Sequence, residues 1–130
     1  MIHEKTVQKA CERALKILKL NKLRFRPMKR KNRVNTRQGF IIGRTNLKTG
    51  LITIDIWTAK LRQPKKMSSI LRTLCHEAAH YQKKPYKQRF KGHWITRQHY
   101  PAYYRQVNKN IEKLKKDKIL KKHFTKKVYS

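Results

Sequence analysis

The charge of the chain sets the strongest limit on how it can fold. Lys and Arg make up 36 of its 130 residues and Asp and Glu only 6, which gives a formal net charge of +30 at pH 7. Because like charges repel one another, a compact state of this chain gains stability when a polyanion lies against it. DNA or RNA is the polyanion that we expect, since Lys and Arg release condensed counterions when they contact phosphates.

The remaining composition favours one small domain without a membrane anchor. Hydrophobic residues make up 38% of the chain, enough for a modest core, and the length suits a single domain. No run of ~18 apolar residues occurs, and the polar N-terminus lacks the apolar segment of a signal peptide. Cys11 and Cys75 are too few for a disulfide scaffold. We therefore expect a cytoplasmic monomer that makes no membrane contact.

The spacing of apolar residues in the first two thirds of the chain predicts an α+β fold. One face of a helix over residues 3–20 would carry Val7, Ala10, Cys11, Ala14, Leu15 and Leu18. A strand is predicted over 23–28, and a hairpin over 40–57 places three isoleucines on one face. A second helix is predicted to run to Lys83, capped by Ser68 or Ser69.

The last third of the chain gives weaker patterns. Residues 86–93 suggest a polar loop, and residues 94–107 suggest partial helix with a kink or a new start at Pro101. Residues 109–130 suggest a basic helix and tail. We therefore expect a main domain over 1–108 and a basic C-terminal segment over 109–130.

The residues that carry chemistry are His76-Glu77-Ala78-Ala79-His80, an HExxH motif on the second predicted helix. Residues four apart share one helix face, so the two imidazoles can bind one Zn²⁺. Glu77 lies about 100° around the helix and can instead reach a water activated by the metal. The motif predicts one Zn²⁺ per chain and a metalloendopeptidase that hydrolyses peptide bonds in a protein or peptide substrate, with Glu77 as general base.

A catalytic zinc site needs a third protein ligand. The candidates are His93 in Lys91-Gly92-His93-Trp94, His99 beside Tyr100, and Glu112 further along the chain. We favour His93, because Gly92 permits a tight backbone next to it.

This layout resembles the SprT-like zinc metallopeptidases, small zincins in which HExxH is followed by a Gly-His-Gly-x-x-aromatic motif. The resemblance covers about residues 1–108 and rests on the HExxH segment and on Gly92-His93, although Trp94 stands in place of the second Gly. It implies His76, His80 and His93 as zinc ligands and Glu77 as the catalytic glutamate. It also implies a small sheet over the active-site helix, a substrate strand at the sheet edge, and action on proteins crosslinked to DNA.

The basic segments predict where a nucleic acid, DNA in preference to RNA, would bind. Residues 29–38 hold basic residues and no acid, and lysines are dense near the C-terminus. The predicted contacts are Arg30, Lys31, Arg33, Arg37, Lys121 and Lys122.

Two other functions fit the same composition. The chain could be a non-catalytic, highly basic DNA- or RNA-binding protein with a structural metal or none, or a ribosome-associated protein in which HExxH is accidental. Glu77 discriminates between the classes, because a structural metal site needs no carboxylate beside its ligands. Ligation by both His93 and His99 would close the site and favour the structural alternative.

Two side-chain groups have open roles at this point. Asp55 either orients a ligand imidazole or pairs with one of many lysines. Tyr100, Tyr103 and Tyr104 either place a phenol near a developing oxyanion or pack a helix onto the core.

Overall fold

The computed structural model describes residues 2–28, 42–58 and 61–124. Arg30, Lys31, Arg33 and Arg37, four of the predicted nucleic-acid contacts, lie outside the described residues. The helices and strands in chain order are α1 (Ile2–Ile17), β1 (Arg24–Pro27), β2 (Gly43–Asn46), β3 (Leu51–Ile54), α2 (Met67–Gln82), β4 (Tyr86–Phe90), β5 (His93–Arg97), α3 (Pro101–Lys115) and the short helix η1 (Leu120–His123).

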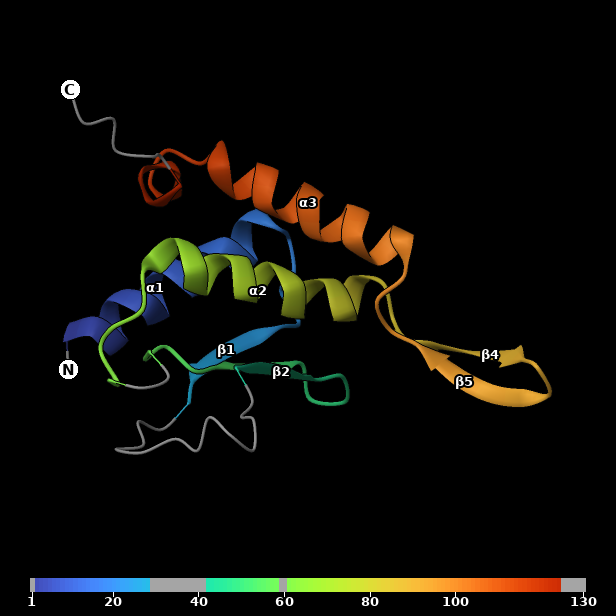
Figure 1. Ribbon diagram of the computed structural model, residues 1–130. Helices are drawn as coiled ribbons and strands as arrows, with labels where there is room; N and C mark the ends of the chain where they lie inside the picture. Colours follow the sequence, from blue (N-terminus) through green and yellow to red (C-terminus); the bar gives the residue numbers. More distant parts are fainter. Residues whose placement is uncertain (1, 29–41, 59–60, 125–130) are drawn as a thin grey trace, which may run out of the picture.

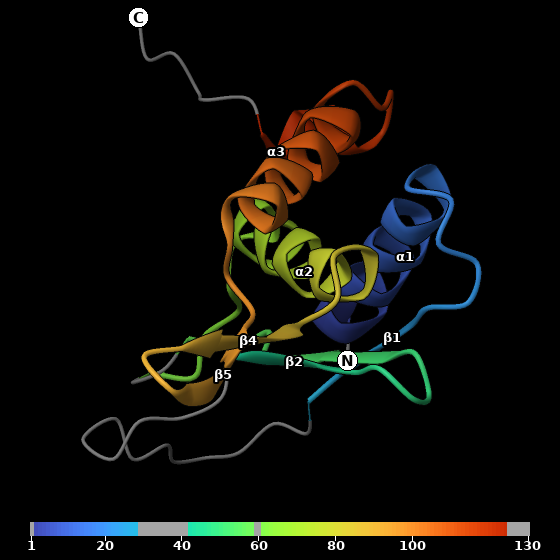
Figure 2. The same cartoon turned by 90° about the vertical axis from the view of Figure 1, so that its right-hand side faces the viewer.

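A mixed sheet carries the helices on one of its faces. Its described strands lie in the order β1-β3-β2, with β1 parallel and β2 antiparallel to β3. Helices α1 and α2 cover one face, and α3 packs on the side of α2 that is turned away from the sheet (Figures 1 and 2). The α+β class predicted from the sequence is confirmed. Among the described residues, no helix combines the length and apolar character needed to cross a bilayer.

The core forms where apolar periodicity predicted it. The predicted stripe of α1 is buried from Val7 to Leu18, and Ile52, Ile54 and Ile56 are fully buried on the face of the sheet that meets the helices. Each buried Val, Leu or Ile side chain among them stabilises the fold by about 1.5–3 kcal/mol when removed from water. The predicted serine cap of α2 is wrong: Lys66 precedes the helix, and no side chain caps it.

The C-terminal third differs from the prediction in two ways. The segment expected to be a loop is a two-stranded antiparallel ribbon of β4 and β5, and helix begins only at Pro101, the predicted new start. Lys91 and Gly92 both have positive φ, +49° and +80°, as a two-residue hairpin turn requires. Helix α3 then continues across residue 108, and its residues Ile111 and Leu114 are buried in the same core as α1 and α2.

Asp55 has a partner that neither expectation named. Its carboxylate accepts two hydrogen bonds from the Arg62 guanidinium, at 2.9 and 3.1 Å, and one from the main-chain N–H of Trp57 at 3.1 Å. The side chains of Arg62 and Asp55 are only 5% and 6% exposed. This buried ion pair therefore holds the connection that leads from β3 into α2.

A second ion pair ties the C-terminal end of the described chain to α1. The Arg13 guanidinium donates two hydrogen bonds of 2.8 Å to the Asp117 carboxylate. The same carboxylate accepts hydrogen bonds from the main-chain N–H groups of Ile119 and Leu120. Arg13 thus lowers the pKa of Asp117 to about 2.

Replacing Asp117 by Asn is expected to lower the free energy of unfolding by about 1 kcal/mol at pH 7, since Arg13 is partly exposed. Because the folded-state pKa lies below the ordinary Asp value of ~3.9, this stabilisation is complete above that value and is lost as the pH falls towards 2. The difference between D117N and wild type should therefore shrink over that interval, as measured by urea unfolding. The control is E112Q, because Glu112 is 62% exposed. A pH-independent difference would contradict the assignment.

Candidate metal centre

Helix α2 presents the HExxH motif beside its buried face. Ile70, Leu71, Leu74 and Ala78 are fully buried against the core, which fixes the rotation of the helix. His76 is then exposed, while Glu77 and His80 are half-buried. One helix therefore carries both the buried face and the chemical groups, as the spacing predicted.

Tyr103 of α3 joins the two histidines of the motif. Its hydroxyl lies 3.4 Å from Nδ1 of His76 and 3.5 Å from Nε2 of His80, and it donates to the main-chain oxygen of His76 at 3.0 Å. Its ring stacks on the His80 imidazole at 4.7 Å between centroids. One nitrogen of each imidazole thus lies within 3.5 Å of the same oxygen, which brings both rings to one place.

His99 is the third imidazole at this place. Its ring centroid lies 5.0 Å from that of His80 and 5.1 Å from that of Tyr103. Two imidazoles on one tetrahedral zinc ion have centroids about 5 Å apart. Burial lowers the pKa values of His76 and His80, and the nearby charge of His99 lowers them further. These histidines are therefore held as neutral imidazoles, the form that binds metal.

His93, the ligand favoured from the sequence, lies elsewhere. It is exposed and pairs with Phe90 next to the turn of the ribbon, whereas His99 follows the opposite end of β5. Six residues of extended chain span about 20 Å, so the two histidines occupy different ends of the ribbon. Glu112, the other alternative, is exposed on α3 and pairs with Lys115 at 3.4 Å. The structure brings neither residue to the HExxH pair.

A signal for His99 was present in the sequence. The Gly-His-Gly-x-x-aromatic pattern needs an aromatic residue four positions after its histidine. Counted from His99 that residue is Tyr103, whereas counted from His93 it is Arg97. Tyr103 is also the aromatic ring that stacks on His80, so the aromatic position of the motif identifies His99 better than the preceding glycine identifies His93.

Glu77 is held by strand β2. The Thr45 hydroxyl lies 2.9 Å from both the main-chain oxygen and Oε1 of Glu77, and its one proton is shared between these two acceptors. Burial raises the pKa of Glu77, while the Thr45 hydrogen bond and the charge of His99 lower it. A Cβ atom at Gly43 would come within 3.1 Å of the Thr73 side chain and 3.4 Å of Cγ of Glu77. The absence of a side chain at Gly43 therefore lets β2 pass close to the carboxylate.

Strand β2 also forms an edge of the described sheet. The main-chain N–H of Asp55 donates to the carbonyl of Ile42 at 2.7 Å, and hydrogen-bonded and non-hydrogen-bonded pairs alternate along an antiparallel ladder. Gly43 and Thr45, paired with Ile54 and Ile52, therefore direct their main-chain groups away from β3. Among the described residues no strand pairs with this edge, and its outward main-chain groups belong to Gly43 and Thr45, which lie beside Glu77.

The three imidazoles fit a zinc ion in donor type, and the separation of the His80 and His99 rings fits two ligands of one ion. Within the described ranges, no group of three or more His, Cys, Asp or Glu side chains is placed so that it could hold a metal ion. The rings of His76 and His80 are instead oriented by the Tyr103 hydroxyl. Metal binding would exchange that hydrogen bonding for coordination.

The lysines predicted to contact nucleic acid near the C-terminus, Lys121 and Lys122, are exposed on η1.

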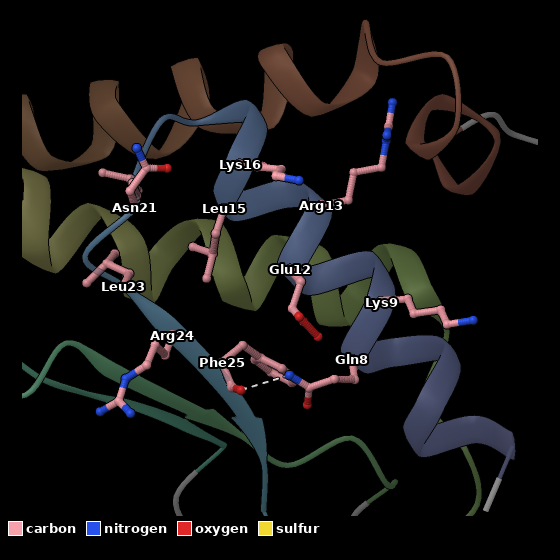
Figure 3. Close-up of a pocket in the computed structure, with 11 residues that line it drawn as sticks. Gln8, Lys9, Glu12, Arg13, Leu15, Lys16, Asn21, Leu23, Arg24 and Phe25 are labelled. Atoms are coloured by element: carbon pink, nitrogen blue, oxygen red, sulfur yellow. Dashed lines mark hydrogen bonds between the residues drawn. The ribbon is translucent and has the colours of Figure 1, made fainter.

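A separate cavity of about 660 Å³, the α1–β1 groove, lies between α1 and β1 (Figure 3). Its lining includes Lys9, Lys16 and Arg24, and Gln8 donates across it to the Phe25 carbonyl at 3.0 Å. No His or Cys belongs to this lining, so the histidine cluster and the groove are distinct places.

No protein-family model matches the chain, and comparisons with curated proteins and with solved structures also found no match.

Proposed function

We propose that this protein is a zinc-dependent metalloendopeptidase of the SprT-like kind, acting on proteins on or near DNA. The observation that carries the proposal is the approach of His99 to the HExxH pair, with Glu77 beside them. The resemblance had implied His93 as the third ligand, and we now assign that role to His99. Three protein ligands leave one coordination position open, as catalytic zinc sites do.

The residues around this site have separate roles. A zinc ion held by His76, His80 and His99 would supply a Lewis acid for peptide hydrolysis. Glu77 is the general base, and Thr45 fixes its carboxylate. Burial and the nearby Glu77 raise the pKa of Tyr103 to about 12, so its hydroxyl remains a hydrogen-bond donor at neutral pH. That proton is donated to the main-chain oxygen of His76, so Tyr103 ties α3 to the helix that carries the motif.

The substrate would bind along the edge of β2. An extended peptide that adds to this edge gains main-chain hydrogen bonds from Gly43 and Thr45. Thr45 donates to Glu77 and a Cβ atom at Gly43 would meet Glu77 at 3.4 Å, so an added strand would lie next to the base. This arrangement supports an endopeptidase, because a strand can extend beyond the site in both directions.

The test is the zinc content of purified protein, measured by mass spectrometry, together with hydrolysis of an unfolded protein substrate. We expect about one zinc per chain in wild type, none in H76A, and a strong reduction in H99A. H93A is the matched control, since it removes an imidazole from the far end of the ribbon, and it should keep both zinc and activity.

The opposite result, zinc lost in H93A and kept in H99A, would return the ligand role to His93. Absence of zinc from wild type, even after reconstitution, would remove the peptidase proposal. The net charge of +30 would then favour the alternative, a non-catalytic DNA- or RNA-binding protein.

A further inference from the structure

The β4–β5 ribbon, residues 86–97, projects from the rest of the domain (Figures 1 and 2). Apart from the partly buried Ile95, all residues of its two strands are exposed. Three of them are large aromatic side chains: Tyr86 is 45% exposed, Phe90 49% and Trp94 68%. Large apolar side chains gathered on one exposed element are typical of a binding surface.

The pairing register places an aromatic ring and cations on each face of the ribbon. Phe90 shares one face with Arg97, whose guanidinium lies 5.8 Å from the ring, and Lys91 in the turn lies 5.4 Å from it. Trp94 lies on the other face opposite Arg89, whose guanidinium is 6.0 Å from the indole. Each ring therefore has a cation beside it.

The charge around the ribbon has one sign. No Asp or Glu occurs between Glu77 and Glu112 in the sequence. The ribbon and the residues leading into it carry Lys83, Lys84, Lys87, Arg89, Lys91 and Arg97. A partner for this surface therefore needs negative charges spaced along its length and flat apolar groups between them.

We propose that the β4–β5 ribbon binds single-stranded nucleic acid. A strand that passes around the turn of the ribbon stacks one unpaired base on Phe90 and another on Trp94 on the opposite face, and the Lys and Arg side chains contact the intervening phosphates. The phosphates of a duplex could contact the Lys and Arg side chains equally well. The faces of its bases are stacked on one another, however, so a duplex offers Phe90 and Trp94 nothing to stack on. A membrane is disfavoured because the ribbon ends in Lys91-Gly92, and inserting that turn would bury a charge.

This site is independent of peptide hydrolysis, and the experiment keeps the two apart. The affinity for a labelled oligothymidylate of about 15 nucleotides is measured by fluorescence anisotropy at about 150 mM salt. Wild type should also show quenching of Trp94, because the other tryptophan, Trp57, is buried. We expect F90A and W94A each to weaken binding by about 10- to 100-fold, and both variants to keep wild-type zinc content and hydrolysis of a short peptide.

Two variants serve as controls. L61A removes an equally apolar side chain, 77% exposed, away from the ribbon, and K48A removes one cation from the β2–β3 turn. Neither should change the affinity by more than about 3-fold, the effect of one screened surface charge.

Several results would overturn the proposal. One is wild-type affinity for the oligonucleotide in F90A and W94A, and another is an equal loss of affinity in these variants for a duplex of the same length. A third is that binding is lost only in K9A, K16A or R24A, the variants of the α1–β1 groove. The fourth is that Trp94 inserts into anionic phosphatidylserine vesicles while the protein does not bind the oligonucleotide. If the protein holds no zinc but its binding of the oligonucleotide depends on Phe90 and Trp94, the ribbon site is supported and the peptidase is refuted. If the protein hydrolyses peptides with zinc but its binding does not depend on these rings, the peptidase is supported and the ribbon site is refuted.

Discussion

Under the proposed peptidase function, replacing Glu77 by Gln is expected to lower peptide hydrolysis by roughly 10²- to 10⁴-fold, the usual contribution of a general base, and to leave the zinc content unchanged. Gln keeps the size of the side chain and can still accept the Thr45 hydrogen bond, but its amide cannot take a proton. The measurement is kcat/KM on an unfolded protein substrate beside metal analysis of the same sample. Loss of activity with retained zinc separates the base from the ligands.

The matched control for E77Q is E112Q. Glu112 was the alternative ligand from the sequence and is exposed on α3, so E112Q should retain zinc and full activity. Wild-type hydrolysis by E77Q would refute the assigned role of Glu77. A large loss in E112Q would mean that Glu112 takes part in the site.

Replacing Asp55 by Asn is expected to lower the free energy of unfolding by about 3–5 kcal/mol, since it removes the carboxylate that accepts two hydrogen bonds from the buried Arg62 guanidinium. This is a large share of the ~5–15 kcal/mol that keeps a typical domain folded. Asn keeps the shape of the side chain and an acceptor for the Trp57 N–H, so the loss reports the charge. Denaturant unfolding at pH 7 measures it.

A double variant distinguishes the ion pair from general damage to the connection. D55L/R62M replaces both charges by apolar side chains of similar reach, and it should be less destabilised than D55N. A D55N variant within about 1 kcal/mol of wild type, the range of an exposed pair, would show that Asp55 and Arg62 do not depend on each other.

The parts of the fold that follow a repeating apolar pattern could be predicted from the sequence. Helices α1 and α2 and the isoleucines of β3 each bury one regular face, so their spacing alone indicated them. The ribbon could not be found in this way, because both of its faces are exposed and its residues show no apolar alternation. Its one local sign was the Lys91-Gly92 turn.

The candidate site also has one part that local sequence spacing predicts and one part that it does not. His76, Glu77 and His80 lie on one helix, and their mutual placement follows from helix geometry. His99 lies near these residues because α3 packs across α2 and because the two strands of the ribbon are antiparallel, so that the chain comes back towards the end of α2. Local spacing in the sequence specifies neither of these tertiary arrangements. The Asp55–Arg62 pair was missed because burial, which is a tertiary property, decides which of many cations an aspartate meets.

The two edges of the described sheet differ in their tendency to self-associate. Strand β1 ends at Pro27, which has no N–H to offer another strand, whereas β2 presents the main-chain groups of Gly43 and Thr45. Open edges of this kind promote aggregation unless they are short or charged. Strand β2 is four residues long, carries exposed Arg44, and belongs to a chain of net charge +30, so two copies repel each other as the edges approach. Colloidal stability should therefore be lowest at the stoichiometry where a bound polyanion neutralises the protein.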